Sequence, residues 1–174
     1  MSLVPQLEIG LEPEELWFME EITTIENGRP GLKKASVFDI PVLLELEKGV
    51  AGTNIYSPML SEDEWKEEMQ RGDVYLIERD GVVMGNLSYE RQGNDRVYIS
   101  GLVISPAFQG QGIGREVLSN LLVELKDVRR IDLVAHPDNQ TALNLYQSLG
   151  FVVESREENY YGDGEPRLVL MLAR

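Results

Sequence analysis

The sequence has 174 residues, of which 43% are hydrophobic and 26% are charged, as is typical of one globular domain in water. With no cysteine and a single histidine, His136, it excludes disulfides and thiolate metal sites, and we expect no bound metal. The formal net charge of −14 argues against a nucleic-acid partner, and the lack of a long apolar run or a signal peptide predicts a cytoplasmic protein without a membrane span.

Residues 1–31 differ from the rest of the chain, because they hold seven acidic residues and one basic residue and show no core pattern. We expect them to be an N-terminal extension and residues 32–174 to be the folded domain. In chain order, the patterns predict a strand at 32–36, helices at 39–49 and 61–72, three strands within 73–104, a helix at about 113–125, a strand at 130–136, a helix at 139–149, and strands at 151–155 and 166–172.

Local signals fix several of these boundaries. Ser61 and Glu64 form a capping box at the start of the second helix. The turn sequences Asp80-Gly81 and Gly93-Asn94-Asp95 separate the three central strands and are typical of hairpins, so the strands are predicted to form an antiparallel meander. The order of elements predicts a mixed α/β domain.

The sequence QGQGIG, residues 109–114, lies where a predicted strand meets a predicted helix. A helix N-terminus carries unpaired N–H groups and a partial positive charge, and glycines let an anion approach the backbone. The spacing therefore predicts a diphosphate-binding turn. A nucleotidase phosphate loop needs Gly-Lys-Ser/Thr and a dinucleotide fold needs G-x-G-x-x-G, and neither pattern is present.

Two longer segments resemble the GNAT superfamily of N-acetyltransferases. Residues 103–118, VISPAFQGQGIGREVL, resemble its acetyl-coenzyme A signature, Q/R-x-x-G-x-G/A, through Gln109, Gly112 and Gly114. Residues 136–151, HPDNQTALNLYQSLGF, resemble its second signature, in which an Asn precedes a helix with a Tyr. The resemblance implies a GNAT-like acyl-CoA N-acyltransferase fold, in which the central sheet splays open between the strands at 97–104 and 131–136.

The resemblance also implies the site residues for acetyl-CoA, the acetyl donor. Backbone groups of the first strand pair with the pantetheine arm, an N–H near Val103 binds the oxyanion, amides of 111–115 hold the diphosphate, and Tyr146 is the general acid. The cofactor-binding residues expected in this way are Leu102, Val103, Ile104, Gln109, Gly110, Gln111, Gly112, Ile113, Gly114, Arg115, Asn139 and Tyr146. For Tyr146, the alternative is a half-buried core tyrosine.

The sequence departs from the family pattern at the general base, since no carboxylate lies within the strand at 96–104. Glu90 and His136 are candidates, and the alternatives are a surface carboxylate and a histidine at a strand end. A site without a strong base suits an α-amine, with a pKa of about 7.7–8.0, better than a lysine amine at about 10.4.

The acceptor is therefore expected to be a peptide or protein N-terminus. Residues 158–172 resemble the tyrosine-pair loop of N-terminal protein acetyltransferases, which implies that Tyr160, Tyr161 and Tyr56 line a peptide groove; the alternative is two tyrosines that cover the end of the sheet. Two other functions remain open: acetylation of a small amine (polyamine, amino acid or aminoglycoside), which the acidic charge favours, and a non-catalytic acyl-CoA-binding regulatory domain. We expect a monomer or a homodimer.

Overall fold

The computed structural model describes residues 28–52 and 55–174. The predicted extension, residues 1–31, lies outside the described residues except for its last four. The described elements are β1 (Gly31–Lys34), the 3-10 turn η2 (Val37–Asp39), α1 (Ile40–Lys48), α2 (Glu62–Arg71), β2 (Asp73–Arg79), β3 (Val82–Arg91), β4 (Arg96–Ile104), the 3-10 turn η3 (Pro106–Phe108), α3 (Ile113–Glu124), β5 (Arg130–Ala135), α4 (Gln140–Ser148), β6 (Val152–Glu157) and β7 (Arg167–Ala173).

The order of strands and helices is the one predicted, because capping and turn signals act locally. At α2, the Ser61 hydroxyl accepts from the Glu64 N–H and the Glu64 carboxylate accepts from the Ser61 N–H. Asp80 and Gly81 both adopt positive φ angles, 51° and 79°, as a tight hairpin between β2 and β3 requires. One boundary differs: the Asp39 carboxylate accepts from the Ser36 N–H at 2.8 Å and closes the turn before α1, and it makes no capping bond to α1 itself.

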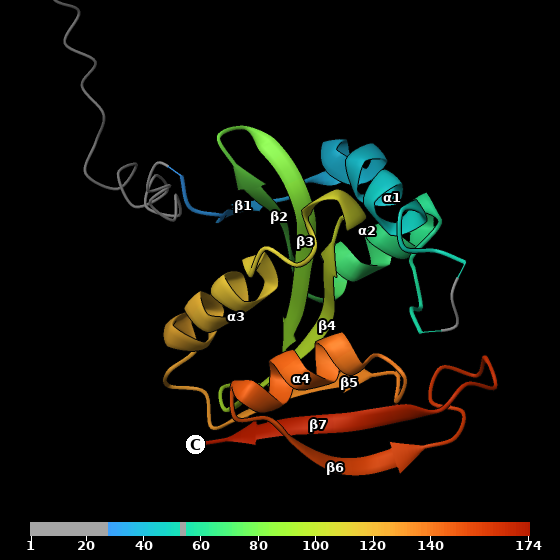
Figure 1. Cartoon of the computed structure of the whole chain (residues 1–174), viewed down its shortest axis with the longest axis vertical. Helices are drawn as coiled ribbons and strands as arrows, with labels where there is room; N and C mark the ends of the chain where they lie inside the picture. The colour runs from blue at the N-terminus through green and yellow to red at the C-terminus, as the bar shows by residue number, and fades with distance from the viewer. Residues whose placement is uncertain (1–27, 53–54) are drawn as a thin grey trace, which may run out of the picture.

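The seven strands form one mixed sheet in the order β1-β2-β3-β4-β5-β7-β6. β4 and β5 are parallel and pair only over Arg96–Ile99 and Arg130–Leu133. Beyond these residues the two strands diverge, and the two halves of the sheet run in very different directions (Figure 1). We call the opening between residues 100–104 of β4 and 134–135 of β5 the wedge. The predicted splayed sheet is confirmed.

Alternation along the strands divides the core between the two faces of the sheet. On one face, α3 and α4 pack in the larger cluster, with Ile77, Leu87 and Ile99 from the strands. On the other face, α1 and α2 pack in a smaller cluster around Trp65, with Val74 and other residues of β2. The two clusters lie on opposite faces of the sheet. Helix α1 and helix α4 therefore approach the wedge from opposite faces.

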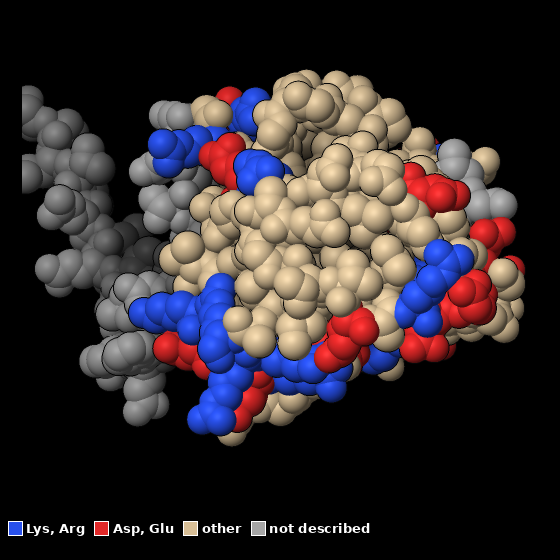
Figure 2. Space-filling model, turned by 60° about the horizontal axis from the view of Figure 1, so that its bottom comes forward, with Lys and Arg blue, Asp and Glu red and all other residues tan. Residues whose placement is uncertain are grey.

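Charged side chains lie around the edge of the face shown in Figure 2. Lys and Arg alternate with Asp and Glu along this edge, and a broad area without charged residues occupies the centre of the face. This face of the described residues therefore carries no continuous basic surface of the kind that nucleic acids need.

Candidate active site

A cavity of about 840 Å³ opens at the wedge. Its walls are the end of β4, the start of α3, the end of β5, helix α4, and residues 55–59 in the loop between α1 and α2. The predicted site residues that line it are Tyr56, Leu102, Val103, Ile104, Gln109, Gly110, Gly112, Ile113, Gly114, Arg115, Asn139, Tyr146 and Tyr161. Gln111 and Tyr160 are not among the lining residues. The fold thus brings nearly all of the predicted residues to one cavity.

The open edge of β4 faces this cavity with free backbone groups. Ser105 donates its N–H to the Met84 carbonyl of β3, and Val103 lies opposite Asn86. Because the hydrogen-bonding groups of a strand alternate in direction, Val103 also points to β3, whereas Leu102 and Ile104 point to the wedge. A bulge sets this phase, since Ser88 pairs with Gly101 and Tyr89 with Ile99, which leaves Ser100 as the extra residue of β4.

The glycine turn ends in unpaired amides. Gly110 and Gly112 have φ angles of 76° and 78°, which other residues adopt only with strain. In the described part of the chain, the first N–H after this turn with a backbone partner is that of Glu116, which donates to the Gly112 carbonyl. Gln109 holds the turn to β4, because its side-chain amide donates to the Ile104 carbonyl at 2.9 Å. The turn can therefore bind an anion, as its spacing predicts.

Two of the predicted cofactor-binding residues, Asn139 and Arg115, also form hydrogen bonds within the protein. The Asn139 side chain accepts from the Ala142 N–H at 3.1 Å and thereby caps α4. The Arg115 guanidinium donates to the Ser148 hydroxyl at 2.6 Å, which links α3 to α4 across the cavity wall. Both side chains therefore fix the position of α4 next to the glycine turn.

Tyr146 projects from α4 into this wall and is 8% exposed. Its ring packs edge-on against Phe151 with 6.0 Å between ring centroids. Burial raises the pKa of Tyr146 to about 12, with smaller contributions from Tyr56 and Tyr161. The hydroxyl is therefore protonated at physiological pH and can donate a hydrogen bond into the cavity.

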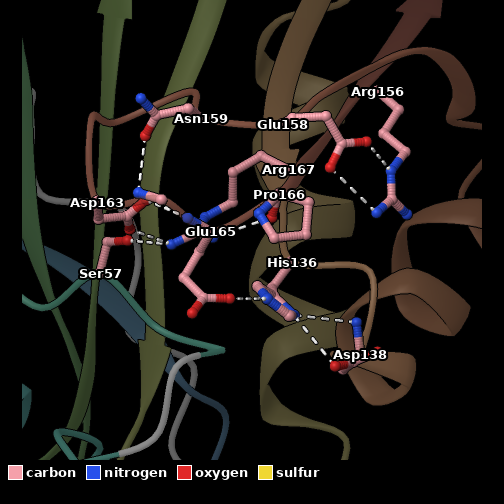
Figure 3. A network of polar contacts seen from close by, with 11 residues as sticks. Ser57, His136, Asp138, Arg156, Glu158, Asn159, Asp163, Glu165, Pro166 and Arg167 are labelled. Atoms are coloured by element: carbon pink, nitrogen blue, oxygen red, sulfur yellow. Dashed lines mark hydrogen bonds and ion pairs between the residues drawn. The ribbon is translucent and has the colours of Figure 1, made fainter.

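Tyr161, from the loop between β6 and β7, and Arg167, at the start of β7, also line the cavity, and Figure 3 shows the polar contacts of Arg167. Arg167 is 2% exposed, and its guanidinium donates to Asp163 at 2.8 Å and to Ser57 at 2.7 Å. Its charge also lies 5.3 Å from the centroid of the Tyr161 ring, a cation–π contact. These contacts hold Tyr161 against the cavity, with its hydroxyl 3.4 Å from that of Tyr98.

Neither predicted base candidate is well placed to accept a proton. Glu90 does not line the cavity, and its carboxylate accepts from the Gln92 amide at 2.7 Å. His136 lines the cavity, but Nδ1 accepts from the Asp138 N–H at 3.1 Å and Nε2 faces the Glu165 carboxylate at 3.4 Å (Figure 3). Nε2 must then carry the proton, so neither nitrogen of His136 has a free lone pair.

One carboxylate at the cavity is not among the residues predicted from the sequence. Glu47 on α1 is 4% exposed and lines the cavity. It follows the buried Leu43 by four residues and so lies on the core-facing side of the helix. A charged residue within a stripe of buried leucines was the signal that could have identified it.

The profile of the acetyltransferase (GNAT) family matches residues 43–151, which is more than half of the chain. The chain belongs to this family. The match begins in α1 and ends directly after α4, so it includes the open edge of β4, the glycine turn and Tyr146. The GNAT membership predicted from the two signatures is confirmed.

Relatives of this GNAT domain carry several substrate names. The L-amino acid N-acyltransferase MnaT of Escherichia coli (strain K12) is 36% identical over 89 residues, which cover 48% of this chain and 52% of the relative. The ribosomal protein bS18-alanine N-acetyltransferase of the same strain is 33% identical over 81 residues, 44% of this chain and 55% of the relative. The chain thus spans about half the length of each of these relatives.

Solved structures share the GNAT fold over more of the chain. The ribosomal-protein-S18-alanine N-acetyltransferase from Escherichia coli has a TM-score of 0.70 at 23% identity, over 83% of this chain and 93% of that one. A spermidine N-acetyltransferase chimera from Vibrio cholerae and hSSAT has a TM-score of 0.69 at 19% identity, over 83% and 95%. A GNAT acetyltransferase from Elizabethkingia anophelis with acetyl-CoA bound has a TM-score of 0.64 at 17% identity, over 85% and 100%. At these identities the likeness concerns the fold alone.

Within residues 28–52 and 55–174, no group of three or more His, Cys, Asp and Glu side chains is arranged to hold a metal ion. Within the same residues, every helix is too short or too polar to cross a membrane.

Proposed function

We propose that this GNAT domain transfers an acetyl group from acetyl-CoA directly to a primary amine, and that the acceptor is the N-terminal α-amine of a peptide or protein. The observation that carries the proposal is the junction of the wedge and the glycine turn. An open strand edge, with both backbone groups of Leu102 and the N–H of Ile104, leads there into a helix start with unpaired amides at residues 110–115. This junction matches an extended ligand arm that ends in a diphosphate.

The residues of the cavity fit acetyl-CoA in this orientation. The amides of the glycine turn hold the diphosphate, and the open edge of β4 pairs with the pantetheine arm as an added strand would. Acetyl-CoA supplies an activated acetyl group whose sulfur leaves as a thiolate. The Leu102 N–H, next to Val103, is the open donor for the carbonyl oxygen that gains negative charge in acyl transfer.

Tyr146 assists the departing sulfur in this proposal. Transfer of a whole proton from a tyrosine of pKa about 12 to a thiolate of pKa about 8.5 is unfavourable by about 5 kcal/mol. The hydroxyl therefore acts chiefly by donating a hydrogen bond to the sulfur as its charge develops, and the thiolate takes its final proton at the end of the reaction.

Two observations support an α-amine acceptor: the tyrosines that line the cavity, and the names of the two curated relatives. Tyr56 and Tyr161 line the same cavity and both lie near enough to Tyr146 to influence its pKa. The two relatives are named for an L-amino acid and for an alanine of a ribosomal protein. The second candidate is a small cationic amine, which the net charge of −14 favours by electrostatic attraction.

An acceptor screen tests the proposal. The full chain is incubated with acetyl-CoA and one of four acceptor types: peptides with free N-termini, N-terminally blocked lysine peptides, free amino acids, and polyamines. The release of free CoA is measured. We expect the highest kcat/KM with free peptide N-termini. Higher values with amino acids or polyamines support the small-amine function, and tight acetyl-CoA binding without turnover on any acceptor supports a regulatory domain.

A further inference from the structure

Glu47 is a buried carboxylate without a cationic partner among the described residues. Its Oε1 accepts from the Asn86 side-chain amide of β3 at 3.1 Å, and the carboxylate also accepts from the backbone N–H of Met59. By contrast, Glu45 on the same helix is exposed and pairs with Lys48 at 2.6 Å. Burying an ion without a counter-ion is costly, so a carboxylate kept in this position calls for a functional explanation.

Glu47 lies at the reacting end of the proposed acetyl-CoA path. The path runs from the glycine turn along Ile104 to Leu102, and the next lining residues along β4 are Gly101 and Ser100. Glu47 lines the same cavity, and its partner Asn86 lies opposite Val103 in the sheet, next to Leu102. A side chain at position 101 would crowd the wall, since a Cβ there lies 2.8 Å from the Ser88 hydroxyl. The same Cβ would lie 4.0 Å from the side-chain oxygen of Asn86, so the wall next to the Glu47–Asn86 contact is closely packed at this position.

We propose that Glu47 is the catalytic base that takes the proton from the acceptor ammonium, an inference that rests on the proposed N-acetyltransferase function. One proton of R–NH₃⁺ passes to the Glu47 carboxylate, which frees the nitrogen lone pair. The nitrogen–carbon bond to the acetyl group then forms and the carbon–sulfur bond breaks. The nitrogen loses its second proton to water as the amide forms, the thiolate, which accepts a hydrogen bond from Tyr146, takes up a proton from water at the end of the reaction, and Glu47 returns its proton to water.

The neighbouring polar groups are less suited to this step. His136 has both ring nitrogens occupied and Tyr146 is a neutral donor. Glu68 of α2 is also buried, but it accepts from the Ser100 hydroxyl and forms an ion pair with Arg71 at 2.9 Å, so both of its oxygens have partners. Glu47 alone among these four groups is an ionisable carboxylate that itself lines the cavity.

The surroundings of Glu47 also suit a base. Burial raises the pKa of Glu47, and Glu64 of α2 raises it further, while the bonds from Asn86 and Met59 lower it. The other titratable or charged groups around the same cavity are Tyr56, Arg115, His136, Asp138, Tyr146, Tyr161 and Arg167, and Glu68 bonds to the lining residue Ser100. The net result is a carboxylate that binds a proton more strongly than one in water, as proton abstraction from an ammonium requires.

The test compares Glu47→Gln with Glu45→Gln as a matched control on the same helix. Glutamine keeps the shape and can still accept from Asn86, but it cannot take a proton. With the acceptor preferred in the screen, we expect kcat/KM of Glu47→Gln at pH 7 to fall about 100-fold or more. The deficit shrinks as the pH approaches 9, because the α-amine then loses its proton to solvent. Acetyl-CoA affinity stays within about twofold of wild type, and Glu45→Gln matches wild type throughout.

A stability measurement separates catalysis from a structural role. The pKa of Glu47 is raised in the folded state, so its contribution to stability is present below its unfolded value and is lost as the pH rises through the folded one. Glu47→Gln, which does not ionise, is therefore expected to melt at a higher temperature than wild type at pH 7, with the difference vanishing near pH 4. A structural role predicts a lower melting temperature instead.

The outcomes are distinct. Wild-type kcat/KM in Glu47→Gln at pH 7, or a loss of activity together with a lower melting temperature, overturns the assignment of Glu47 and leaves the proposed function standing. A wild-type chain that binds acetyl-CoA and acetylates none of the acceptors overturns the proposed function and the assignment with it.

Discussion

Replacing Tyr146 with Phe gives a prediction in which activity and stability can be measured on the same variant. The substitution keeps the ring that packs on Phe151 and removes only the hydroxyl that faces the cavity. We expect kcat/KM to fall about 10- to 100-fold, because one hydrogen bond to the leaving sulfur is lost, and acetyl-CoA affinity to change less than twofold. Steady-state kinetics and calorimetric titration with acetyl-CoA give the two values.

The same variant should respond differently to alkaline pH. The pKa of Tyr146 rises from about 10 in the unfolded chain to about 12 in the folded protein, so the buried hydroxyl stabilises the fold fully below pH 10 and loses this contribution towards pH 12. At pH 11 the loss is about 1.4 kcal/mol, and it approaches about 2.7 kcal/mol above pH 12. Tyr146→Phe lacks the titrating group, so all other alkaline effects cancel in the comparison with wild type.

Urea unfolding of both proteins at pH 7 and pH 11 measures this difference. The free energy of unfolding of wild type should fall about 1.4 kcal/mol more than that of Tyr146→Phe between the two pH values. An equal fall in both proteins refutes the argument that Tyr146 is kept neutral by burial. Unchanged kcat/KM in the variant refutes its role towards the leaving sulfur.

Three further substitutions test other parts of the site. Gly112→Ala places a side chain at a φ angle of 78°, so we expect unfolding free energy to fall by about 1–2 kcal/mol in urea titrations and acetyl-CoA to bind at least tenfold more weakly in calorimetry. Tyr161→Ala should raise KM for the peptide several-fold in kinetic assays and Tyr160→Ala should not, because only Tyr161 lines the cavity; equal effects contradict this. Asp132→Asn weakens the 2.6 Å ion pair with Arg96, which joins β5 to β4 next to the wedge. We expect a lower melting temperature in a thermal scan, by an amount that corresponds to about 1–2 kcal/mol of unfolding free energy. An unchanged melting temperature speaks against this link.

Glu47 illustrates how a residue at the cavity can escape sequence reasoning. The candidates for the base near the strand at 96–104 in the sequence are Glu90 and His136. Glu47 lies on a helix about 50 residues earlier, and only the packing of α1 against β3 and β4 brings it to the wedge. Contacts between distant segments leave no local pattern in the sequence. The one sequence signal for Glu47 was its position on the same side of the helix as the leucines.

The sequence by itself determined the order of the elements, the glycine turn and the family. Helix periodicity, capping boxes, hairpin turns and a glycine cradle all depend on residues a few positions apart, so the chain carries them locally. The tertiary structure alone decided three things: which backbone groups of β4 face the wedge, which tyrosine of the pair enters the cavity, and which carboxylate is buried there. The physical reason is that a single extra residue, Ser100, sets the direction of every later backbone group on β4. The ion pair of Arg167 with Asp163 and its hydrogen bond to Ser57 position the loop that holds Tyr161.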